Sequence, residues 1–288
     1  MAIDGRTGSL ANGAPGSVRS QPTMSTIDLA AYLGRIEYTG PRRPDLETLR
    51  ALHLAHATHV PFENLDIQMG RPILLDLSSL EDKIVRRHRG GYCFEQNTLF
   101  QEVLRAFGFD LIACEARVRY RAEGQVRPRT HMVLTVAVDG VDYLCDVGFG
   151  GDGLLQPLAL DGAPHDEYGR TLRADVEASE IVLQELRAEG WEDLYGFVPE
   201  ARHPIDFAVA NWFTSTYPES VFVKTLTVQR ATPTARHALR QLTYNVREGT
   251  GDTAREIDRG ELIPLLRRTF GIDLPEATRF RALDGSGT

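Results

Sequence analysis

Residues 89–97 have the sequence Arg89-Gly90-Gly91-Tyr92-Cys93-Phe94-Glu95-Gln96-Asn97. The double glycine interrupts one helical pattern, and a new apolar periodicity begins directly after it. We therefore expect Cys93 to lie on a Gly-rich turn, at the start of a helix that ends with Gly108 as its C′ residue. At that end of a helix, the macrodipole and the unpaired backbone N–H groups favour a thiolate. Cys93 is thus the first candidate for a nucleophile.

Helical periodicity dominates the first third of the chain. Apolar residues recur at helical spacing over 29–36 and again from 46, and the second helix must end before Pro61. Residues 78–81 read Ser-Ser-Leu-Glu, a capping-box pattern that predicts a third helix running toward Arg89.

The period changes to two after Gly108, which indicates β-structure. We expect strands at residues 110–120, 132–138, 141–147, 181–186, 191–197, 221–229 and 238–246. Pro204 suits the first position of a short helix to about residue 210, and a closing helix covers 262–270. A helical section, a β section and a mixed closing section follow one another, so the fold class is α+β.

The dipeptide Asp139-Gly140 lies between two of the predicted strands and is a strong signal for a two-residue hairpin. With that turn, His131 lies opposite Gly148 and shares a face with Asp146, one diagonal step along. Diagonal neighbours are roughly 7–8 Å apart at the backbone, which an imidazole and a carboxylate can span. The turn therefore predicts a His131–Asp146 hydrogen bond, with Gly148 leaving room above the imidazole.

Cys93, His131 and Asp146 can together form a nucleophile, a general base and a group that orients the base. This set predicts acyl transfer through a thioester on Cys93, with nearby backbone N–H groups stabilising the oxyanion. The alternative for each residue is structural: a buried thiol, a satisfied strand-end histidine and a strand-terminating acid. Cys114 and Cys145 lie within strand patterns, and we expect both in the core.

Composition excludes several classes of partner for this chain of 288 residues and 32.0 kDa. The formal net charge of −8 argues against nucleic acid, because phosphate binding needs a basic face. A basic run at residues 83–89 could receive an anionic ligand or form a solvated helix face. No apolar run has the length of a bilayer-spanning helix, so no membrane partner is expected.

The cysteine content and the first residues bear on localisation. Three sparse cysteines fit a reducing cytosol, and the absence of a C-x-x-C pair argues against a structural zinc site, so we expect no metal. Residues 1–24 are rich in Gly, Ala, Ser and Pro and lack the apolar core of a signal peptide. We expect them to be a flexible extension, native or added, of a cytoplasmic protein, while the oligomeric state stays open.

These motifs resemble the arylamine N-acetyltransferases, whose hallmark is Arg-Gly-Gly-x-Cys followed by His and Asp. Here His131 follows Cys93 by 38 residues and Asp146 follows His131 by 15, spacings similar to those of bacterial members. Three further stretches are similar to family segments, and the likeness runs from about residue 25 to the C-terminus. They are Pro61-Phe62-Glu63-Asn64-Leu65, Asp146-Val147-Gly148-Phe149-Gly150-Gly151 and Ser215-Thr216-Tyr217-Pro218-Glu219-Ser220-Val221-Phe222.

The resemblance implies a helical bundle at 25–109 with the nucleophile, a β-barrel-like domain of antiparallel strands at 110–203 with His and Asp, and an α/β lid at 204–288. It also implies a cysteine-protease-like Cys-His-Asp core and a ping-pong reaction. In that reaction acetyl-CoA acetylates Cys93, and an arylamine or arylhydrazine then attacks the thioester, with His131 as base and acid.

The same resemblance implies roles around the pocket. Phe62, Phe149 and Phe222 would line the acceptor site, although each could be an ordinary core aromatic. Gly148 and Gly150 would let the backbone approach coenzyme A, although a plain tight turn would also need glycine.

Two arginines and three histidines receive lesser roles. We expect Arg89 to brace the catalytic loop. Arg119 would favour acceptors with a carboxylate if its side chain entered the pocket, and otherwise it is an outward-facing strand residue. His53, His56 and His59 we take as packing or surface groups.

Other interpretations keep the same residues. An amide synthase would use the Cys–His–Asp set on a carrier-bound thioester, and a thiol hydrolase or transglutaminase-like enzyme would use it on a peptide. A binding module could keep the fold with an inactive site, in which case Cys93 would react only near the free-thiol pKa of about 8.5.

Overall fold

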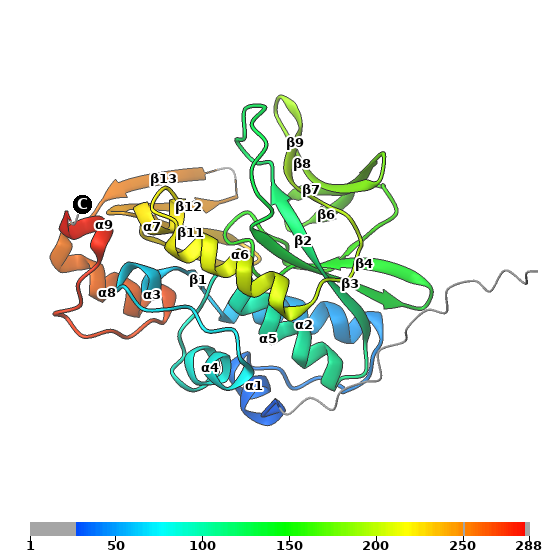
Figure 1. The fold of residues 1–288 in the computed structure, drawn as a ribbon, viewed down its shortest axis with the longest axis horizontal. Coiled ribbons are helices and arrows are strands. Elements are labelled where there is room, and N and C mark those ends of the chain that lie inside the picture. Colours follow the sequence, from blue (N-terminus) through cyan, green and yellow to red (C-terminus); the bar gives the residue numbers. More distant parts are fainter. Residues whose placement is uncertain (1–26, 250, 286–288) are drawn as a thin grey trace, which may run out of the picture.

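The computed structural model describes residues 27–249 and 251–285, so the prediction for residues 1–24 lies outside the described residues. A layer of helices lies below an eight-stranded sheet and a five-stranded sheet, as Figure 1 shows. Within the described ranges, no helix is both long and apolar enough to cross a bilayer.

The helical section contains α1 (Leu29–Arg35), α2 (Leu46–His59), the short α3 (Leu65–Gln68) and α5 (Cys93–Ala106). Asp28 and Asp45 cap the first two, since each carboxylate accepts a hydrogen bond from the backbone N–H three residues on. Helix α5 begins at Cys93, and Gly108 follows it at a φ of 87°, both as predicted.

The third helix differs from the prediction. Helix α4 (Leu77–Leu80) begins earlier, because Asp76 and not Ser78 caps it by accepting from the Ser79 N–H at 3.0 Å. It then widens into the π-helix η1 (Glu81–Arg86), with an i→i−5 bond from the Arg87 N–H to the Asp82 carbonyl. A capping pattern does not reveal such a widened turn, which directs Lys83 into the interior.

The eight-stranded sheet has the order β5-β4-β3-β2-β9-β8-β7-β6. Its strands are β2 (Asp110–Val118), β3 (His131–Val138), β4 (Val141–Cys145), β5 (Leu158–Ala159), β6 (His165–Glu167), β7 (Arg170–Glu177), β8 (Glu180–Arg187) and β9 (Gly190–Phe197). All neighbours are antiparallel, and β5 also contacts β7, so the sheet curls into a nearly closed barrel. Val138 pairs with Val141 across the predicted two-residue turn. Strand β7 and the short β5 and β6 had not been predicted.

The five-stranded sheet has the order β1-β10-β11-β12-β13. Its strands are β1 (Phe62–Glu63), β10 (Thr227–Ala231), β11 (Ala235–Arg240), β12 (Thr243–Glu248) and β13 (Gly251–Glu256). Strand β1 comes from the helical section and pairs with β10, which joins two distant parts of the chain. Helices α8 (Arg259–Phe270) and α9 (Arg281–Asp284) follow, and Leu266 and Phe270 of α8 pack on this sheet.

Two strands of the closing section were predicted wrongly. The range 221–229 begins with a helical turn, α7 (Val221–Lys224), because the Ser220 side chain accepts from the Phe222 N–H at 3.3 Å. The range 238–246 crosses a hairpin turn, since Gln241 has a φ of 54° between β11 and β12.

Helix α6 (Pro204–Thr216) is longer than predicted and crosses the front of the molecule in Figure 1. Its residues Phe207 and Ala210 belong to the same buried cluster as the side chains of α2 and α5. The domain limits at 110 and 204 stay predictions, but α6 packs with the helical section and not with the sheet that follows it.

Candidate active site

Cys93 lies at the first residue of α5, against a cavity of about 310 Å³ to which all three sections contribute. The cavity wall includes His131 from β3, as well as Phe62, Phe149 and Phe222, the three aromatic residues that the resemblance had placed there. Cys93 is buried apart from 3% of its surface, and its Sγ lies 3.7 Å from the Thr130 carbonyl oxygen.

His131 and Asp146 form the predicted hydrogen bond, with 2.7 Å between Nε2 and Oδ2. Both side chains are buried. Burial alone would lower the pKa of His131, but the charge and hydrogen bond of Asp146, together with a hydrogen bond to Cys93, raise that pKa to about 10. The imidazole is therefore held as a cation next to the Cys93 sulfur.

Asn97 is a site residue that sequence reasoning missed. Its Nδ2 donates to Asp146 Oδ1 at 2.9 Å and to the Met132 carbonyl at 2.7 Å, while its Oδ1 accepts from the Val147 N–H at 3.1 Å. Asn97 is one helical turn after Cys93 and on the same face of α5, and this spacing was the available signal. It connects α5, the helix that begins with Cys93, directly to the carboxylate that holds His131.

Asp146 has further partners that fix its charge. The Gly148 N–H donates to Oδ1 at 2.9 Å, and His53 Nε2 accepts from the Asp146 N–H at 3.2 Å. Burial would raise the pKa of Asp146, but His131, Asn97 and the Gly148 N–H together lower it below its ordinary value. His53 is buried and neutral, because burial lowers its pKa to about 4. It is thus more than a packing group.

The two glycines of the 148–150 turn have structural reasons of their own. A Cβ at Gly148 would lie 2.7 Å from the Cys93 Cα, so this position is filled by the Cys93 backbone and does not leave open room above the imidazole. Gly150 has a φ of 96°, and a Cβ there would lie 2.7 Å from Gln229 Oε1. Gly148 lines the Cys93 cavity and Gly150 does not. Contact of either with coenzyme A stays a prediction.

Tyr195 of β9 is a second residue that was missed. Its buried ring lies 4.9 Å from the His131 ring and 5.0 Å from the Phe149 ring, centroid to centroid. Phe149 in turn lies 5.2 Å from His131. The two aromatic rings therefore pack against the imidazole and exclude water from part of it. No local pattern predicts this, because β9 reaches the site only through its pairing with β2.

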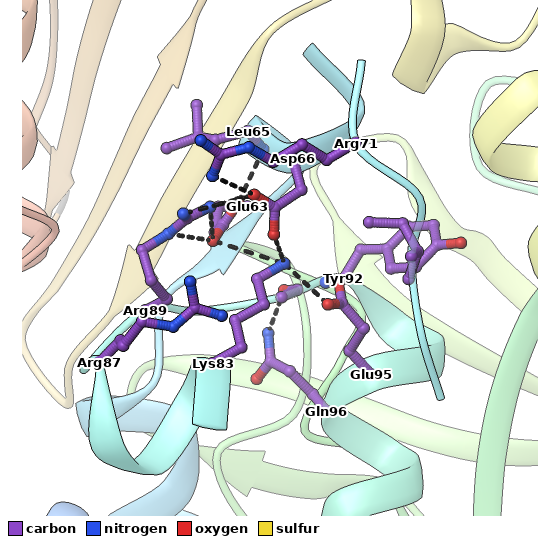
Figure 2. Close-up of polar contacts among 12 residues, drawn as sticks. Glu63, Leu65, Asp66, Arg71, Lys83, Arg87, Arg89, Tyr92, Glu95 and Gln96 are labelled. Atoms are coloured by element: carbon purple, nitrogen blue, oxygen red, sulfur yellow. Dashed lines mark hydrogen bonds and ion pairs between the residues drawn. The ribbon is translucent and has the colours of Figure 1, made fainter. Parts of the chain in front are cut away.

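Beside the Gly-rich turn and the first turn of α5 lies a charged cluster, which we define as Glu63, Asp66, Lys83, Arg89 and Glu95 (Figure 2). The Lys83 Nζ lies 2.7 Å from Glu95 Oε1 and 2.7 Å from Asp66 Oδ2. The Arg89 Nε donates to Glu63 Oε1 at 2.9 Å. All five side chains are buried. At Lys83 and Arg89, the basic run 83–89 is therefore neither a ligand site nor a solvated helix face.

The charged cluster also holds the backbone that carries Cys93. Glu95 accepts from the Tyr92 N–H at 3.1 Å, and Glu63 accepts from the Leu65 N–H at 2.7 Å. The Glu63 N–H donates to the Gly91 carbonyl at 3.0 Å, so β1 is bound to the Gly-rich turn. Arg89 thus braces the catalytic loop, as expected from the sequence.

The double glycine is required by close packing within this turn. A Cβ at Gly90 would lie 1.9 Å from the Pro61 carbonyl oxygen, and one at Gly91 would lie 2.8 Å from the Glu95 Cβ. No side chain fits at either position, which explains why two glycines stand in the turn before Cys93.

Comparison with known proteins assigns the chain to a family. A family model described as N-acetyltransferase matches residues 45–279. The arylamine N-acetyltransferase of Mycolicibacterium smegmatis is 41% identical, over 86% of this chain and 93% of its own length. The chain belongs to the arylamine N-acetyltransferase family.

Solved structures of this arylamine N-acetyltransferase family agree with that assignment. The Mycobacterium tuberculosis enzyme has a TM-score of 0.84 at 36% identity, covering 89% of this chain and 98% of its own. The Mycobacterium marinum protein in complex with CoA has a TM-score of 0.85 at 34% identity, covering 89% and 98%. The resemblance seen in the sequence is thereby confirmed, and the α+β fold with its barrel-like sheet agrees with it.

Arg119 differs from what a pocket role in an arylamine N-acetyltransferase would require. Its guanidinium is bound by three carboxylates, those of Glu180 at 2.6 Å, Glu177 at 2.8 Å and Asp193 at 3.0 Å. It does not line the Cys93 cavity. Because these acids occupy its guanidinium, Arg119 does not have the pocket role considered from the sequence.

Proposed function

We propose that this protein transfers the acetyl group of acetyl-CoA to arylamines and arylhydrazines through an acetyl-thioester on Cys93. The observation that carries the proposal is the 2.7 Å contact of His131 with Asp146 beside a cysteine at a helix N-terminus, all on one cavity. Cys93 is the nucleophile, His131 the general base and acid, and Asp146 the group that orients and charges the imidazole.

In the first half-reaction, the Cys93 thiolate attacks the carbonyl carbon of acetyl-CoA. The N-terminal N–H groups of α5 stabilise the oxyanion of the tetrahedral intermediate. When the intermediate collapses, the bond to the CoA sulfur breaks and the CoA thiolate takes a proton from the His131 imidazolium. The products are acetylated Cys93, neutral His131 and free CoA.

In the second half-reaction, the lone pair of the arylamine nitrogen attacks the thioester carbonyl. Neutral His131 takes the proton from that nitrogen, and the Cys93 sulfur leaves as a thiolate. This restores the imidazolium–thiolate pair. Asp146 stabilises the His131 imidazolium, which is present at the beginning of the cycle and again at its end.

The cavity supports an aromatic acceptor. The rings of Phe62 and Phe222 are in tilted contact, with 6.0 Å between centroids and 47° between planes, and Phe149 packs beside His131. Edge and tilted contacts of this kind suit a flat aromatic ligand. The volume of about 310 Å³ is at the small end of the range for ligand pockets, which fits a single-ring amine.

The cosubstrate and the compartment are proposed on further observations. The Mycobacterium marinum relative is titled as a complex with CoA, and the thioester must enter this cavity to reach Cys93. The Cys93, Cys114 and Cys145 thiols are all unpaired and buried, which supports a reducing cytosol.

The decisive experiment measures the intact mass of the protein after incubation with acetyl-CoA alone. We expect a gain of one acetyl group on Cys93, stable until aniline or an arylhydrazine is added and then lost as product forms. Cys93→Ser is the control that should accept no acetyl group under the same conditions. Turnover by Cys93→Ala, or reaction with a peptide or a carrier-bound thioester in place of acetyl-CoA, would refute the proposal.

A further inference from the structure

The strand ladder stops one residue before Asp146. The last pair between β3 and β4 joins Leu134 to Cys145, so the buried backbone N–H of Asp146 needs an acceptor from elsewhere in the fold. His53 of α2 supplies it, because its Nε2 accepts from the Asp146 N–H at 3.2 Å. A residue far away in the sequence thus completes the hydrogen bonding of the strand end that carries the carboxylate.

This contact determines the tautomer of His53. A backbone N–H can only donate, so Nε2 must offer a lone pair and the ring proton must lie on Nδ1. A doubly protonated ring would point an N–H of its own at the Asp146 N–H. The contact therefore requires a neutral imidazole with one particular proton position.

The surroundings of His53 keep its ring neutral and in place. The side chain is fully buried, and burial lowers its pKa to about 4, which the Leu155 backbone and the charge of Asp146 do not offset. His56 on the same helix adds no charge, since burial lowers its pKa to about 3. The Phe100 ring of α5 packs edge-on against His53, with 5.8 Å between centroids and 88° between planes.

Asp146 is thus held from two helices. Asn97 of α5 donates to its carboxylate at 2.9 Å, and His53 of α2 accepts from its backbone at 3.2 Å. The same carboxylate contacts His131 at 2.7 Å. His53 does not line the Cys93 cavity, so any effect that it has on the chemistry passes through Asp146.

We propose that His53 is a positioning residue, which as a neutral Nδ1–H imidazole holds the Asp146 backbone where the carboxylate meets His131. The inference deepens the proposed function and rests on it for the chemistry, but the contact does not depend on the acyl donor. A shift of Asp146 would lengthen its hydrogen bond to His131 and weaken the support for the imidazolium. Cys93 would then lose part of the positive charge that favours its thiolate.

A histidine that merely filled the core would behave differently. Its replacement by an apolar side chain of similar size would change the stability of the protein, but it would not change the protonation of His131 or the reactivity of Cys93. Measurements of protonation therefore separate the two roles, which a measurement of stability alone cannot do.

The first experiment determines the tautomer of His53 in the wild-type protein. Two-bond ¹H–¹⁵N correlations of protein labelled with ¹⁵N-histidine distinguish a proton on Nδ1 from one on Nε2, and the spectrum of His53→Leu identifies the signals of this residue. We expect a neutral ring with its proton on Nδ1 at neutral pH, well above its pKa of about 4.

The second experiment compares variants. His53→Leu removes the acceptor and keeps an apolar side chain, whereas His53→Gln can place its Oε1 where Nε2 lies in the wild type. His59→Leu is the matched control, a histidine at the end of the same helix whose Nδ1 contacts the Ala55 carbonyl at 2.8 Å. Leu266→Ala is a control for stability alone, because it opens a cavity in the core beside the five-stranded sheet.

In His53→Leu, we expect the pKa of His131 to fall from about 10 toward its ordinary 6.5, as followed by the same NMR correlations. Alkylation of Cys93 by iodoacetamide should need a higher pH to reach half of its maximal rate. At saturating acetyl-CoA, acetylation of Cys93 should slow roughly 10-fold, less than the roughly 100-fold that a misplacement of about 1 Å can cause. The acetyl-CoA concentration that gives half of the maximal rate should not change, since His53 does not line the cavity.

The other variants sharpen this expectation. His53→Gln should recover most of the wild-type alkylation profile, because it restores an acceptor for the Asp146 N–H. His59→Leu and Leu266→Ala should keep that profile, although urea denaturation should show that Leu266→Ala is less stable.

Three results would overturn the inference. A proton on Nε2 of wild-type His53 would exclude the contact with Asp146, whether or not the variants fold. An unchanged His131 titration and alkylation profile in a folded His53→Leu would mean that the histidine only fills the core. An equal shift of the profile in Leu266→Ala would attribute it to lost stability. Neither NMR nor alkylation needs acetyl-CoA, so failure of wild-type Cys93 to be acetylated would refute the proposed function and would be seen separately.

Discussion

Two groups of buried charges flank Cys93, and they differ in what they bind. On the barrel side, His131 and Asp146 form one pair whose imidazole faces the cavity. On the helical side, the charged cluster binds itself and the surrounding backbone, and none of its members lines that cavity. The buried charges thus have different surroundings: the His131–Asp146 pair borders the cavity, and the charged cluster binds the backbone of the Gly-rich turn.

The two groups also differ in how far hydrogen bonds and opposite charges offset the burial of their carboxylates. Asp146 accepts hydrogen bonds from His131, Asn97 and the Gly148 N–H, which keep its pKa low despite burial. Glu95 is bound by Lys83 and the Tyr92 N–H, yet burial, reinforced by repulsion from Glu63, raises its pKa to about 7. At neutral pH the Asp146 carboxylate is therefore charged, whereas the Glu95 carboxylate is partly protonated.

The largest expected effect is a loss of activity when Cys93 or His131 is replaced. Cys93→Ala and His131→Ala should each lower kcat by about 10⁴-fold or more, because the nucleophile and its base act as a unit. Turnover of acetyl-CoA with aniline measures this. Chemical denaturation should show that Cys93→Ala stays folded. Substantial residual turnover by either variant would contradict the view that the barrel side carries the chemistry and the charged cluster only the structure.

Substitutions in the charged cluster on the helical side should lower the stability of the protein and leave its chemistry intact. Arg89→Met leaves Glu63 buried without its main partner, and we expect a loss of about 3–5 kcal/mol in the free energy of unfolding. Arg87→Met, in which only an exposed pair with Asp82 is lost, is the matched control and should cost less than about 1 kcal/mol. Urea unfolding gives both values. If Arg89→Met instead kept its stability and lost kcat, the cluster would belong to the catalytic machinery.

The His131–Asp146 pair should leave a signature in the pH dependence of stability. The pKa of His131 is about 10 in the folded protein against an ordinary value of 6.5, so the folded state holds one more proton between these two pH values. The free energy of unfolding should therefore fall as pH rises from 6.5 to 10, by on the order of a few kcal/mol from this group.

Asp146→Asn isolates that contribution. Without the carboxylate, burial dominates and the pKa of His131 falls, so the variant should lack most of this decline. Urea denaturation of both proteins at intervals across pH 6.5–10 gives the two curves, and their difference cancels the other titrating groups. Parallel curves would show that His131 is not held as an imidazolium.

The sequence predicted the parts of this site that depend on local chemistry. Asp139-Gly140 determined the hairpin register, and from that register the His131–Asp146 contact followed, which the 2.7 Å hydrogen bond bears out. Gly90-Gly91 likewise located the start of α5 at Cys93. In both cases a few adjacent residues determine the backbone, because the turn types involved admit few residue types.

The parts that were missed depend on contacts between distant segments. Tyr195 reaches His131 through the pairing of β9 with β2, and Arg240 reaches the cavity through the pairing of β11 with β10. Arg119 and Arg127 illustrate the limit. Both follow β2 in the chain, and only the three-dimensional structure shows that Arg119 is bound by acids and that Arg127 lines the cavity.

Glu95→Gln gives the smallest and most specific test of the comparison. Because the pKa of Glu95 is about 7 against an ordinary 4.5, wild-type stability from this group is present below pH 4.5 and is lost as pH rises through 7. The uncharged glutamine cannot titrate. The variant should therefore gain stability relative to the wild type between pH 4.5 and 7, as measured by urea denaturation. Absence of this relative gain would mean that Glu95 is stabilised as a carboxylate by Lys83, as Asp146 is by His131. The two sides of Cys93 would then be alike in their electrostatics and different only in their access to the cavity.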